Sequence, residues 1–171
     1  MLKRKIIPYG GWSSPLSAGW IADDTVSLGQ LCLDGSDVYW NEVRANDNGR
    51  SVVCKLGEKG VVEDFSPPNG NVRSRVHEYG GGAYFVERGE LWYSDGNDGR
   101  VWHKSRDGTA GPITSSKNCR YADLVRDPNR NQLIAVSEEH IEGRKESYNR
   151  LVGIRDTGEV VTLVEGADFY A

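Results

Sequence analysis

The sequence predicts an all-β fold, a partial β-propeller of about three four-stranded antiparallel blades. Helical periodicity is nearly absent, short β-branched and aromatic runs alternate with Gly, Asn and Asp turns, and the pattern repeats. Val52, Val101 and Leu151, at matching positions in the third run of each repeat, lie 49 and 50 residues apart. Four strands in a repeat of this length are typical of propeller blades. A tandem of hairpins in an ordinary β-sandwich is the alternative.

The first blade is expected within residues 25–66. Its runs are separated by turns whose Gly, Asn and Asp residues suit the positive φ angles of hairpins. The four runs are Ser27–Leu33, Asp37–Val43, Ser51–Leu56 and Val61–Phe65.

The second and third blades are expected within residues 82–115 and 119–165. The runs of the second are Ala83–Val86, Glu90–Tyr93, Arg100–His103 and Pro112–Thr114. Those of the third are Tyr121–Val125, Gln132–Val136, Arg150–Ile154 and Glu159–Leu163. Residues 166–171 look like the start of a fourth. Because propellers close with about 4–8 blades, residues 1–171 predict an incomplete ring. Its two open faces, expected to be rich in Trp and Tyr, would favour self-association.

Length, charge and cysteine content narrow the class of protein. The 171 residues suggest one domain or a piece of a larger one. The net charge of −4 argues against general nucleic-acid binding. No run approaches the ~20 apolar residues of a membrane span, and the basic opening is not followed by the apolar run of a signal peptide. Cys32, Cys54 and Cys119 lack metal or disulfide spacing, so we expect buried thiols and a cytoplasmic location.

One segment between the first two blades combines bunched charges with three consecutive glycines. It is the run Arg-Ser-Arg-Val-His-Glu-Tyr-Gly-Gly-Gly at residues 73–82. Glycines let the backbone turn sharply or approach another group closely. If the segment is extended, alternation places Arg73, Arg75 and His77 on one side. Ser74, Val76 and Glu78 would then lie on the other.

This run resembles the amino-terminal propeller of bacterial prolyl-oligopeptidase-type serine peptidases, in the acylaminoacyl-peptidase and dipeptidyl-peptidase-like branch. Weaker matches follow the same order along the chain. They are Pro8-Tyr9-Gly10 with Trp12, Ser14 and Pro15, Leu33-Asp34-Gly35 with Val38-Tyr39-Trp40, Arg120-Tyr121-Ala122-Asp123 with Asp127-Pro128, and the run from Val164 to Tyr170.

The resemblance implies a non-catalytic propeller cap that gates and orients peptide substrates for a carboxyl-terminal α/β-hydrolase domain. The sequence holds no Gly-x-Ser-x-Gly motif, and its three histidines have no matched serine and carboxylate. We therefore expect that catalytic domain to be absent from these residues, assign no catalytic residue, and expect the parent protein to be the serine peptidase. The alternative is a stand-alone interaction module in which two three-blade arcs close a ring by pairing.

Five residues of the segment are candidates for contacting the substrate. An arginine such as Arg73 or Arg75 suits a peptide carbonyl or carboxylate because its planar fork offers fixed donors. Glu78 suits a free amino terminus, and His77 and Tyr79 complete the cluster. The alternative is an Arg–Glu network that only orders the segment, with His77 capping a strand end.

No cofactor or metal is expected. Residues 95–99 look like a calcium loop but lack the closing glutamate, so they predict a hairpin turn. His103 and His140 have no ligand partners at useful spacing. Residues 138–146 are expected to form a solvated hairpin loop, and the five tryptophans to pack between blades.

Overall fold

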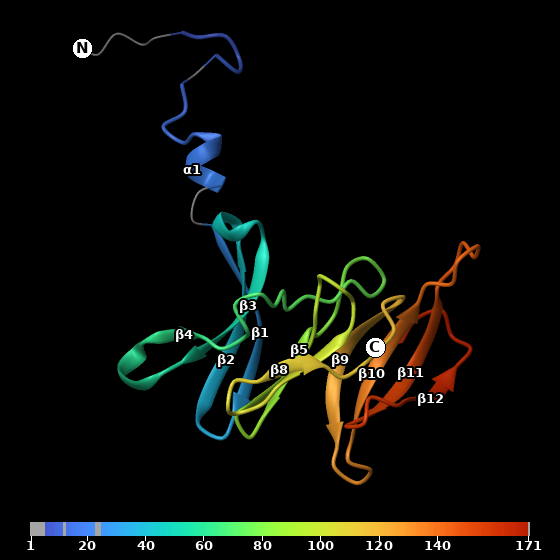
Figure 1. The fold of residues 1–171 in the computed structure, drawn as a ribbon. Helices are drawn as coiled ribbons and strands as arrows, with labels where there is room; N and C mark the ends of the chain where they lie inside the picture. The colour runs from blue at the N-terminus through green and yellow to red at the C-terminus, as the bar shows by residue number, and fades with distance from the viewer. Residues whose placement is uncertain (1–5, 12, 23–24, 171) are drawn as a thin grey trace.

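The computed structural model describes residues 6–11, 13–22 and 25–170 and confirms the all-β partial propeller. Three four-stranded antiparallel sheets each keep their strands in chain order (Figure 1). The first sheet contains β1 (Val26–Asp34), β2 (Asp37–Arg44), β3 (Arg50–Leu56) and β4 (Val62–Asp64). The second contains β5 (Tyr84–Glu87), β6 (Glu90–Ser94), β7 (Val101–Lys104) and β8 (Ala110–Pro112). The third contains β9 (Cys119–Asp127), β10 (Gln132–Glu139), β11 (Tyr148–Arg155) and β12 (Val160–Glu165).

Short turns between consecutive strands produce these antiparallel pairs. Between β1 and β2, Gly35 has a φ of +62°, which glycine adopts without strain. Residues 95–99 join the antiparallel strands β6 and β7, so the predicted hairpin turn is confirmed. Within that turn Gly99 has a φ of +76°, and a Cβ there would lie 2.7 Å from the carbonyl oxygen of Cys119. The turn therefore packs directly against the start of the third sheet.

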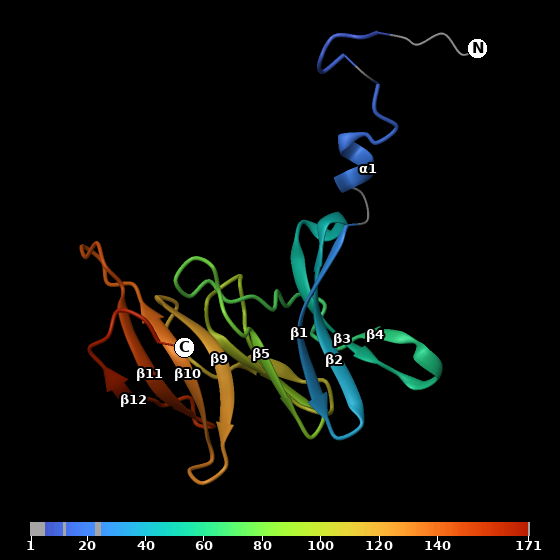
Figure 2. The ribbon, with the colours of Figure 1, turned by 180° about the vertical axis from the view of Figure 1, so that it is seen from behind.

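The sheets contact one another through their first strands, as the blades of a propeller do. β1 contacts β5, and β9 contacts both β5 and β6. The three sheets lie side by side in both views (Figures 1 and 2). We call the end that holds the β1–β2, β5–β6 and β9–β10 turns the hairpin end. The opposite end, which holds residues 65–83, the β6–β7 turn and residues 113–118, is the linker end.

Two apolar cores fill the spaces between neighbouring sheets. Strand β6 serves both, because alternate side chains point to opposite faces of a strand. Leu91 and Tyr93 pack toward the first sheet, whereas Trp92 packs toward the third. The core between the second and third sheets contains Trp92, Val101, Cys119, Tyr121, Leu124, Leu133, Ala135, Val152 and Ile154.

The tryptophans only partly follow the prediction. Trp92 and Trp102 pack between sheets as expected. Trp40 is half-buried on β2. Trp20 is 66% exposed, so the prediction is wrong there. It lies in the short helix α1 (Ala18–Ala22), which belongs to a segment that extends away from the sheets (Figure 1). Trp12, part of the weaker family match, lies outside the described residues.

The first and last strands of the array carry exposed apolar side chains. They are leucines and valines rather than the expected Trp and Tyr: Leu28, Leu31 and Leu33 on β1, and Val160, Leu163 and Val164 on β12. After β12, residues 166–170 form no strand, and Ala171 lies outside the described residues. Within the described part of the chain, no helix has the length and apolar character that a membrane span requires.

Candidate functional site

The three consecutive glycines lie where the segment between β4 and β5 approaches other backbone and side-chain atoms. Gly80 has a φ of +87°, and a Cβ there would lie 2.9 Å from the carbonyl oxygen of Ser74. A Cβ on Gly81 or Gly82 would lie 2.9 Å or 2.8 Å from a carboxylate oxygen of Asp123. Real Cβ atoms do not make such contacts, so the predicted close approach is confirmed at all three positions.

Both neighbouring sheets hold the start of β5. Gln30 accepts a hydrogen bond from the Ala83 N–H (2.7 Å) and donates one to the Tyr84 carbonyl (2.6 Å). The carboxylate of Asp123 accepts from the Gly82 N–H at 2.6 Å. Gln30 and Asp123 both have positive φ, in bulges of β1 and β9 that shift the strand register. The position at which the segment enters β5 is therefore fixed from both sides.

The beginning of the candidate cluster is extended, as the alternation predicts. Arg73 and Arg75 are exposed, whereas Ser74 and Val76 are buried. Val76 packs with Ala122 of β9. The two arginine side chains are thus directed away from the protein core.

The alternation fails after Val76, because the chain turns there. The Glu78 N–H donates to the Arg75 carbonyl at 3.0 Å, and the Gly80 N–H donates to the Val76 carbonyl at 2.9 Å. His77 and Glu78 have φ values of +53° and +66°. Such left-handed conformations cost about 1–2 kcal/mol for a residue with a Cβ. The prediction that His77 and Glu78 lie on opposite sides of an extended strand is therefore wrong. We call residues 75–80 the strained turn.

Charged side chains from the third sheet hold the strained turn in place. Arg120, in β9, donates from Nη1 to Glu78 Oε1 at 2.6 Å and to the Arg75 carbonyl at 2.9 Å. The His77 N–H donates to Glu138 Oε2 at 3.1 Å, and the same oxygen lies 3.5 Å from Arg120 Nη1. The Arg–Glu network considered as the alternative therefore exists. Its hydrogen bond from Arg120 holds the pKa of Glu78 below the ordinary value, yet 77% of the Glu78 side chain remains exposed.

The position of Glu138 shows that a second prediction, the solvated loop, is wrong at its start. The sequence suggested a solvated loop over residues 138–146, but β10 continues through Glu139. The side chain of Glu138 is only 6% exposed, and His140 Nε2 lies 3.4 Å from its carboxylate. A carboxylate this deep needs partners, and the strained turn supplies one of them through the His77 N–H. The exposed loop starts at His140 instead.

Aromatic rings lie beside the exposed Glu78 carboxylate. The His77 ring lies 4.6 Å from the Phe169 ring and 5.9 Å from the Tyr79 ring, between centroids. Tyr79 is 78% exposed, and Phe169 is also largely exposed. His77 Nε2 is buried and has no hydrogen-bond partner among the described residues. The strained turn thus presents a carboxylate and an aromatic surface together.

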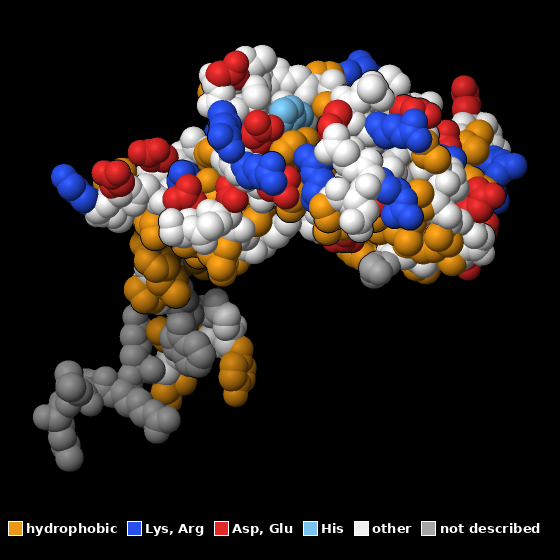
Figure 3. All heavy atoms as spheres, turned by 90° about the horizontal axis from the view of Figure 1, so that it is seen from below, with side chains coloured by type: hydrophobic (Ala, Val, Ile, Leu, Met, Phe, Trp, Pro, Cys, Tyr) orange, Lys and Arg blue, Asp and Glu red, His pale blue; other side chains and the backbone are white. Residues whose placement is uncertain are grey.

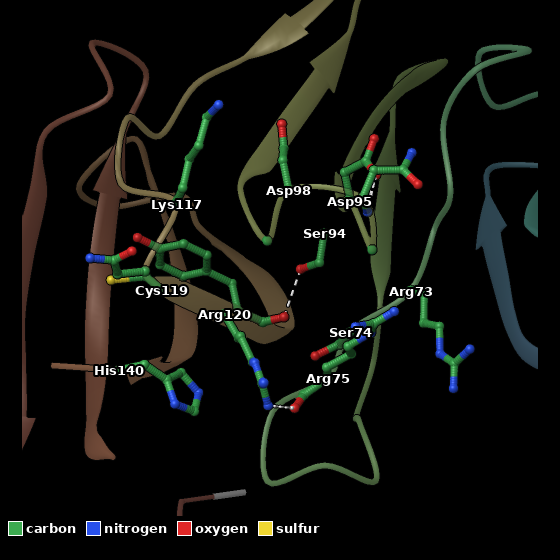
Figure 4. A pocket seen from close by; sticks show the side chains of 15 residues that line it. Arg73, Ser74, Arg75, Ser94, Asp95, Asp98, Lys117, Cys119, Arg120 and His140 are labelled. Atoms are coloured by element: carbon green, nitrogen blue, oxygen red, sulfur yellow. Dashed lines mark hydrogen bonds between the residues drawn. The ribbon is translucent and has the colours of Figure 1, made fainter. Parts of the chain in front are cut away.

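A cavity of about 470 Å³ adjoins the strained turn at the linker end (Figure 4). Arg73 and Arg75 line it together with Asp95 and Asp98 of the β6–β7 turn, and with Lys117, Arg120 and His140. Burial raises the pKa of Asp95. Burial also acts to raise the pKa of Asp98, but hydrogen bonds from Arg100 outweigh it and hold that pKa below the ordinary value. Of the predicted site residues, Arg73 and Arg75 therefore line the cavity, whereas His77, Glu78 and Tyr79 project from the turn next to it.

Sequence reasoning missed Arg120, Lys117 and Glu138. Arg120 belongs to the run Arg-Tyr-Ala-Asp at residues 120–123, one of the weaker family matches. That run also contains Asp123, which holds the glycines. The match was therefore a usable signal for two residues that support the site. Lys117 and Glu138 carried no comparable signal.

A second cavity, of about 490 Å³, lies at the hairpin end of the same two sheets. Its charged and aromatic side chains contact one another. Trp92 stacks on His103 at 4.6 Å between ring centroids, and the Arg126 guanidinium lies 4.8 Å from the Trp92 ring. His103 Nε2 lies 2.8 Å from Glu90, and Arg126 Nε lies 3.4 Å from Glu87. Positive and negative side chains are interspersed on this end of the molecule (Figure 3).

The cysteines form neither a disulfide nor a metal site in the described structure. Cys54 and Cys119 are buried and Cys32 is half-buried, all as free thiols. Burial raises the pKa of the Cys54 thiol to about 11. A thiol with this pKa is largely protonated at neutral pH, which agrees with a packing role. The described residues hold no group of three or more His, Cys, Asp or Glu side chains that could bind a metal.

Solved structures similar to this chain include a puromycin-hydrolyzing peptidase and a puromycin hydrolase. The structure of a Mycobacterium tuberculosis puromycin-hydrolyzing peptidase matches 98% of this chain with 31% sequence identity and a TM-score of 0.82. A puromycin hydrolase matches 93% with 26% identity and a TM-score of 0.80. A mutant of puromycin hydrolase complexed with PGG matches with a TM-score of 0.78.

This chain spans 29% of the first of those structures and 27% of the other two. Protein-family models and curated proteins gave no match. The similarity therefore covers nearly the whole of this chain but less than a third of each of those three chains.

Proposed function

We propose that this chain, which belongs to the amino-terminal propeller region of the prolyl-oligopeptidase-type serine peptidases, orients peptide substrates. It would also limit their access to a catalytic domain. That domain would be an α/β-hydrolase carried elsewhere in the same protein. The protein as a whole would be a serine peptidase. The similarity to puromycin-hydrolysing peptidases supports this assignment.

The observation that carries the proposal is the strained turn with its exposed carboxylate. Two neighbouring non-glycine residues in left-handed conformation are unusual, and such strain persists only where surrounding contacts enforce it. Here Arg120 and Glu138 enforce it from the third sheet. The result is a Glu78 side chain that is ionised, exposed and held in one place. A preorganised group of this kind is what ligand binding requires.

In this proposal each residue of the cluster has its own role. Glu78 pairs with the free amino terminus of the peptide through a charge-assisted hydrogen bond. Tyr79 and His77 contact its first side chain, and Arg73 and Arg75 contact carbonyl or carboxylate oxygens further along the peptide. The catalytic step belongs entirely to the hydrolase domain.

A pair of substrates tests the role of Glu78 in the native-length protein, by which we mean the complete protein that contains this chain. Alanine p-nitroanilide has a free amino group, whereas N-acetylalanine p-nitroanilide does not. We expect Glu78→Gln to lower kcat/KM for the free amine about 10- to 100-fold, the value of one charge-assisted hydrogen bond. The acetylated substrate should change less than about threefold.

The matched control is Glu63→Gln, which removes an exposed carboxylate from β4 in the first sheet. It should leave both substrates unaffected. Equal losses on the two substrates, or no loss on either, would contradict the role of Glu78. Absence of any hydrolysis by the native-length protein would contradict the peptidase assignment itself.

A stand-alone interaction module is the second candidate, favoured by the exposed apolar side chains on β1 and β12. Leu31 is 70% exposed, and Leu163 and Val164 on β12 are also exposed. Two arcs pairing through these strands would bury that surface and close a six-bladed ring. Light scattering after gel filtration of the 171-residue chain tests this. A dimer that Leu31→Glu dissociates supports ring closure, whereas a monodisperse monomer contradicts it.

A further inference from the structure

Three cationic side chains that line the linker-end cavity make no direct polar contact with the described residues. Arg73 and Arg75 lie on the segment before the strained turn, and Lys117 precedes β9. None of the three side chains forms a hydrogen bond or ion pair within the described part of the chain. Arg100 and Arg120, at the same end, instead contact carboxylates at 2.7 Å and 2.6 Å. Arg75 interacts electrostatically with the Glu78 carboxylate, but no described carboxylate forms an ion pair with any of the three cations, so their positive charge is only partly compensated.

The carboxylates that line the cavity do not neutralise this charge. Asp98 is paired with Arg100, and buried Asp95 accepts a hydrogen bond from the Asn97 N–H at 2.7 Å. Four cationic side chains and two carboxylates line the linker-end cavity. The hairpin-end cavity of similar size is lined by three of each. An excess of cations in a concave site favours an anionic ligand.

The cations surround the cavity and do not converge on one point. Figure 4 shows the side chains of Lys117 and Arg120 extending in opposite directions. The Arg73 side chain lies on the other side of the segment that joins β4 to β5. A single small anion could contact only one or two of them. An extended ligand, with a carboxylate at one place and backbone carbonyls at others, matches this spread, since guanidinium groups bind both kinds of oxygen.

We propose that the linker-end cavity binds a carboxylate group of a peptide, either its carboxyl terminus or an acidic side chain. That the peptide is a substrate rests on the proposed function, whereas binding of the carboxylate does not. The cavity adjoins the strained turn through Arg75 and Arg120. A peptide whose amino terminus pairs with Glu78 could therefore extend into it.

Calorimetric titration of the native-length protein tests the proposal, after phenylmethylsulfonyl fluoride has blocked any serine nucleophile. The probes are tetra-alanine with a free carboxyl terminus, tetra-alanine amide, and Ala-Asp-Ala-Ala amide. All three have the same free amino terminus, so Glu78 contributes equally. We expect the free acid to bind about tenfold more tightly than the amide, as one charge-assisted hydrogen bond predicts.

The aspartate-containing amide distinguishes the two sources of the carboxylate. If it binds as tightly as the free acid, the site accepts side-chain carboxylates. If it binds as weakly as tetra-alanine amide, the site is specific for the carboxyl terminus. Both results support the proposal. Equal affinity for the free acid and its amide overturns it, as does displacement of the peptide by inorganic phosphate at equal concentration.

Two variants locate the effect. Because the cations do not converge on one point, we expect one of the two variants, Arg75→Met or Lys117→Met, to reduce the preference for the free acid from about tenfold to less than about threefold. Both side chains are exposed and lack partners, so melting temperatures should be unchanged. The matched control is Arg88→Met, which removes the same charge at the hairpin-end cavity. A preference that survives both test variants, or that Arg88→Met removes, overturns the assignment to this cavity.

The experiments distinguish failure of this inference from failure of the proposed function. Selective binding of the free acid without hydrolysis of any peptide contradicts the proposed function and leaves this inference intact. Hydrolysis of peptides with equal binding of acid and amide contradicts this inference and leaves the proposed function intact.

Discussion

The interface between the second and third sheets has one continuous apolar core but two different ends. At the hairpin end, Arg126 and His103 both contact Trp92, and the cavity is lined by equal numbers of Arg side chains and carboxylates. At the linker end, three cations form no hydrogen bond or ion pair with the described residues, and the strained turn holds Glu78 in an exposed position. Cavities of similar volume therefore differ in how far the protein satisfies its own charges.

The connections at each end explain the difference. At the hairpin end His103 pairs with Glu90 on the neighbouring strand β6, and Arg126 of β9 pairs with Glu87 of the adjacent sheet. The linker end holds the longer segments between sheets, residues 65–83 and 113–118, which carry the strained turn and the three cations. The groups that we propose to bind peptides therefore lie on loops supported by a rigid scaffold, as is common for binding sites.

The largest expected effect concerns Trp92, which is nearly fully buried between the two sheets. Trp92→Ala should reduce the free energy of unfolding by about 3–5 kcal/mol, because it removes a large core side chain and its stacking partner contacts. Urea denaturation measures the loss. Trp20→Ala, at an exposed position in α1, should change stability by less than about 0.5 kcal/mol. Equal effects of the two substitutions would contradict the structure.

A direct comparison of the two ends uses one arginine from each. Arg126 is 14% exposed and lies over Trp92 between Glu87 and Asp156. Arg126→Met should cost about 1–2 kcal/mol of unfolding free energy through the lost cation–π contact and ion pairs. Arg75→Met, which breaks no hydrogen bond or ion pair to the described residues, should cost less than about 0.5 kcal/mol. Similar losses would show that the two ends do not differ as described.

The smallest expected effect is a shift in pH dependence at the strained turn. The hydrogen bond from Arg120 lowers the pKa of Glu78 from its ordinary value of 4.5. A carboxylate with a lowered pKa stabilises the fold above the ordinary value and loses that contribution as pH falls through the lowered one. Arg120→Met should therefore raise the pKa of Glu78, and the acidic limb of kcat/KM for free-amine substrates should move to higher pH.

We expect that shift to be small, because Glu78 is exposed to solvent. A pH–rate profile of the native-length protein measures it. Arg120→Lys keeps the positive charge and should restore part of the wild-type profile, which a purely structural role would not require. An acidic limb that does not move in Arg120→Met would show that Arg120 does not set the ionisation of Glu78.

Much of the fold was predictable from short-range pattern. The runs of β-branched and aromatic residues correspond to the observed strands, because strand pairing through tight turns depends on neighbouring residues. The glycines at 80–82 were correctly read as a place of close approach. The approaching group, Asp123, was not identifiable, since its hydrogen bond to Gly82 joins residues 41 positions apart.

The candidate site was predictable only in part, for the same reason. Local alternation placed Arg73 and Arg75 correctly on the exposed side and misplaced His77 and Glu78. Their left-handed conformation is enforced by Arg120 and Glu138, which are 42 and 61 positions away from Glu78 and His77 respectively. No local pattern encodes such contacts.

The sequence by itself determined the repeat, the strands, the turns and the residues of the charged segment, since each depends on conformational preferences within a few residues. The tertiary structure alone decided that Glu138 is buried, that Glu78 is held by Arg120, and that Arg75 and Lys117 border one cavity. Those features depend on how the second and third sheets pack against each other, and packing brings together residues that the chain keeps far apart.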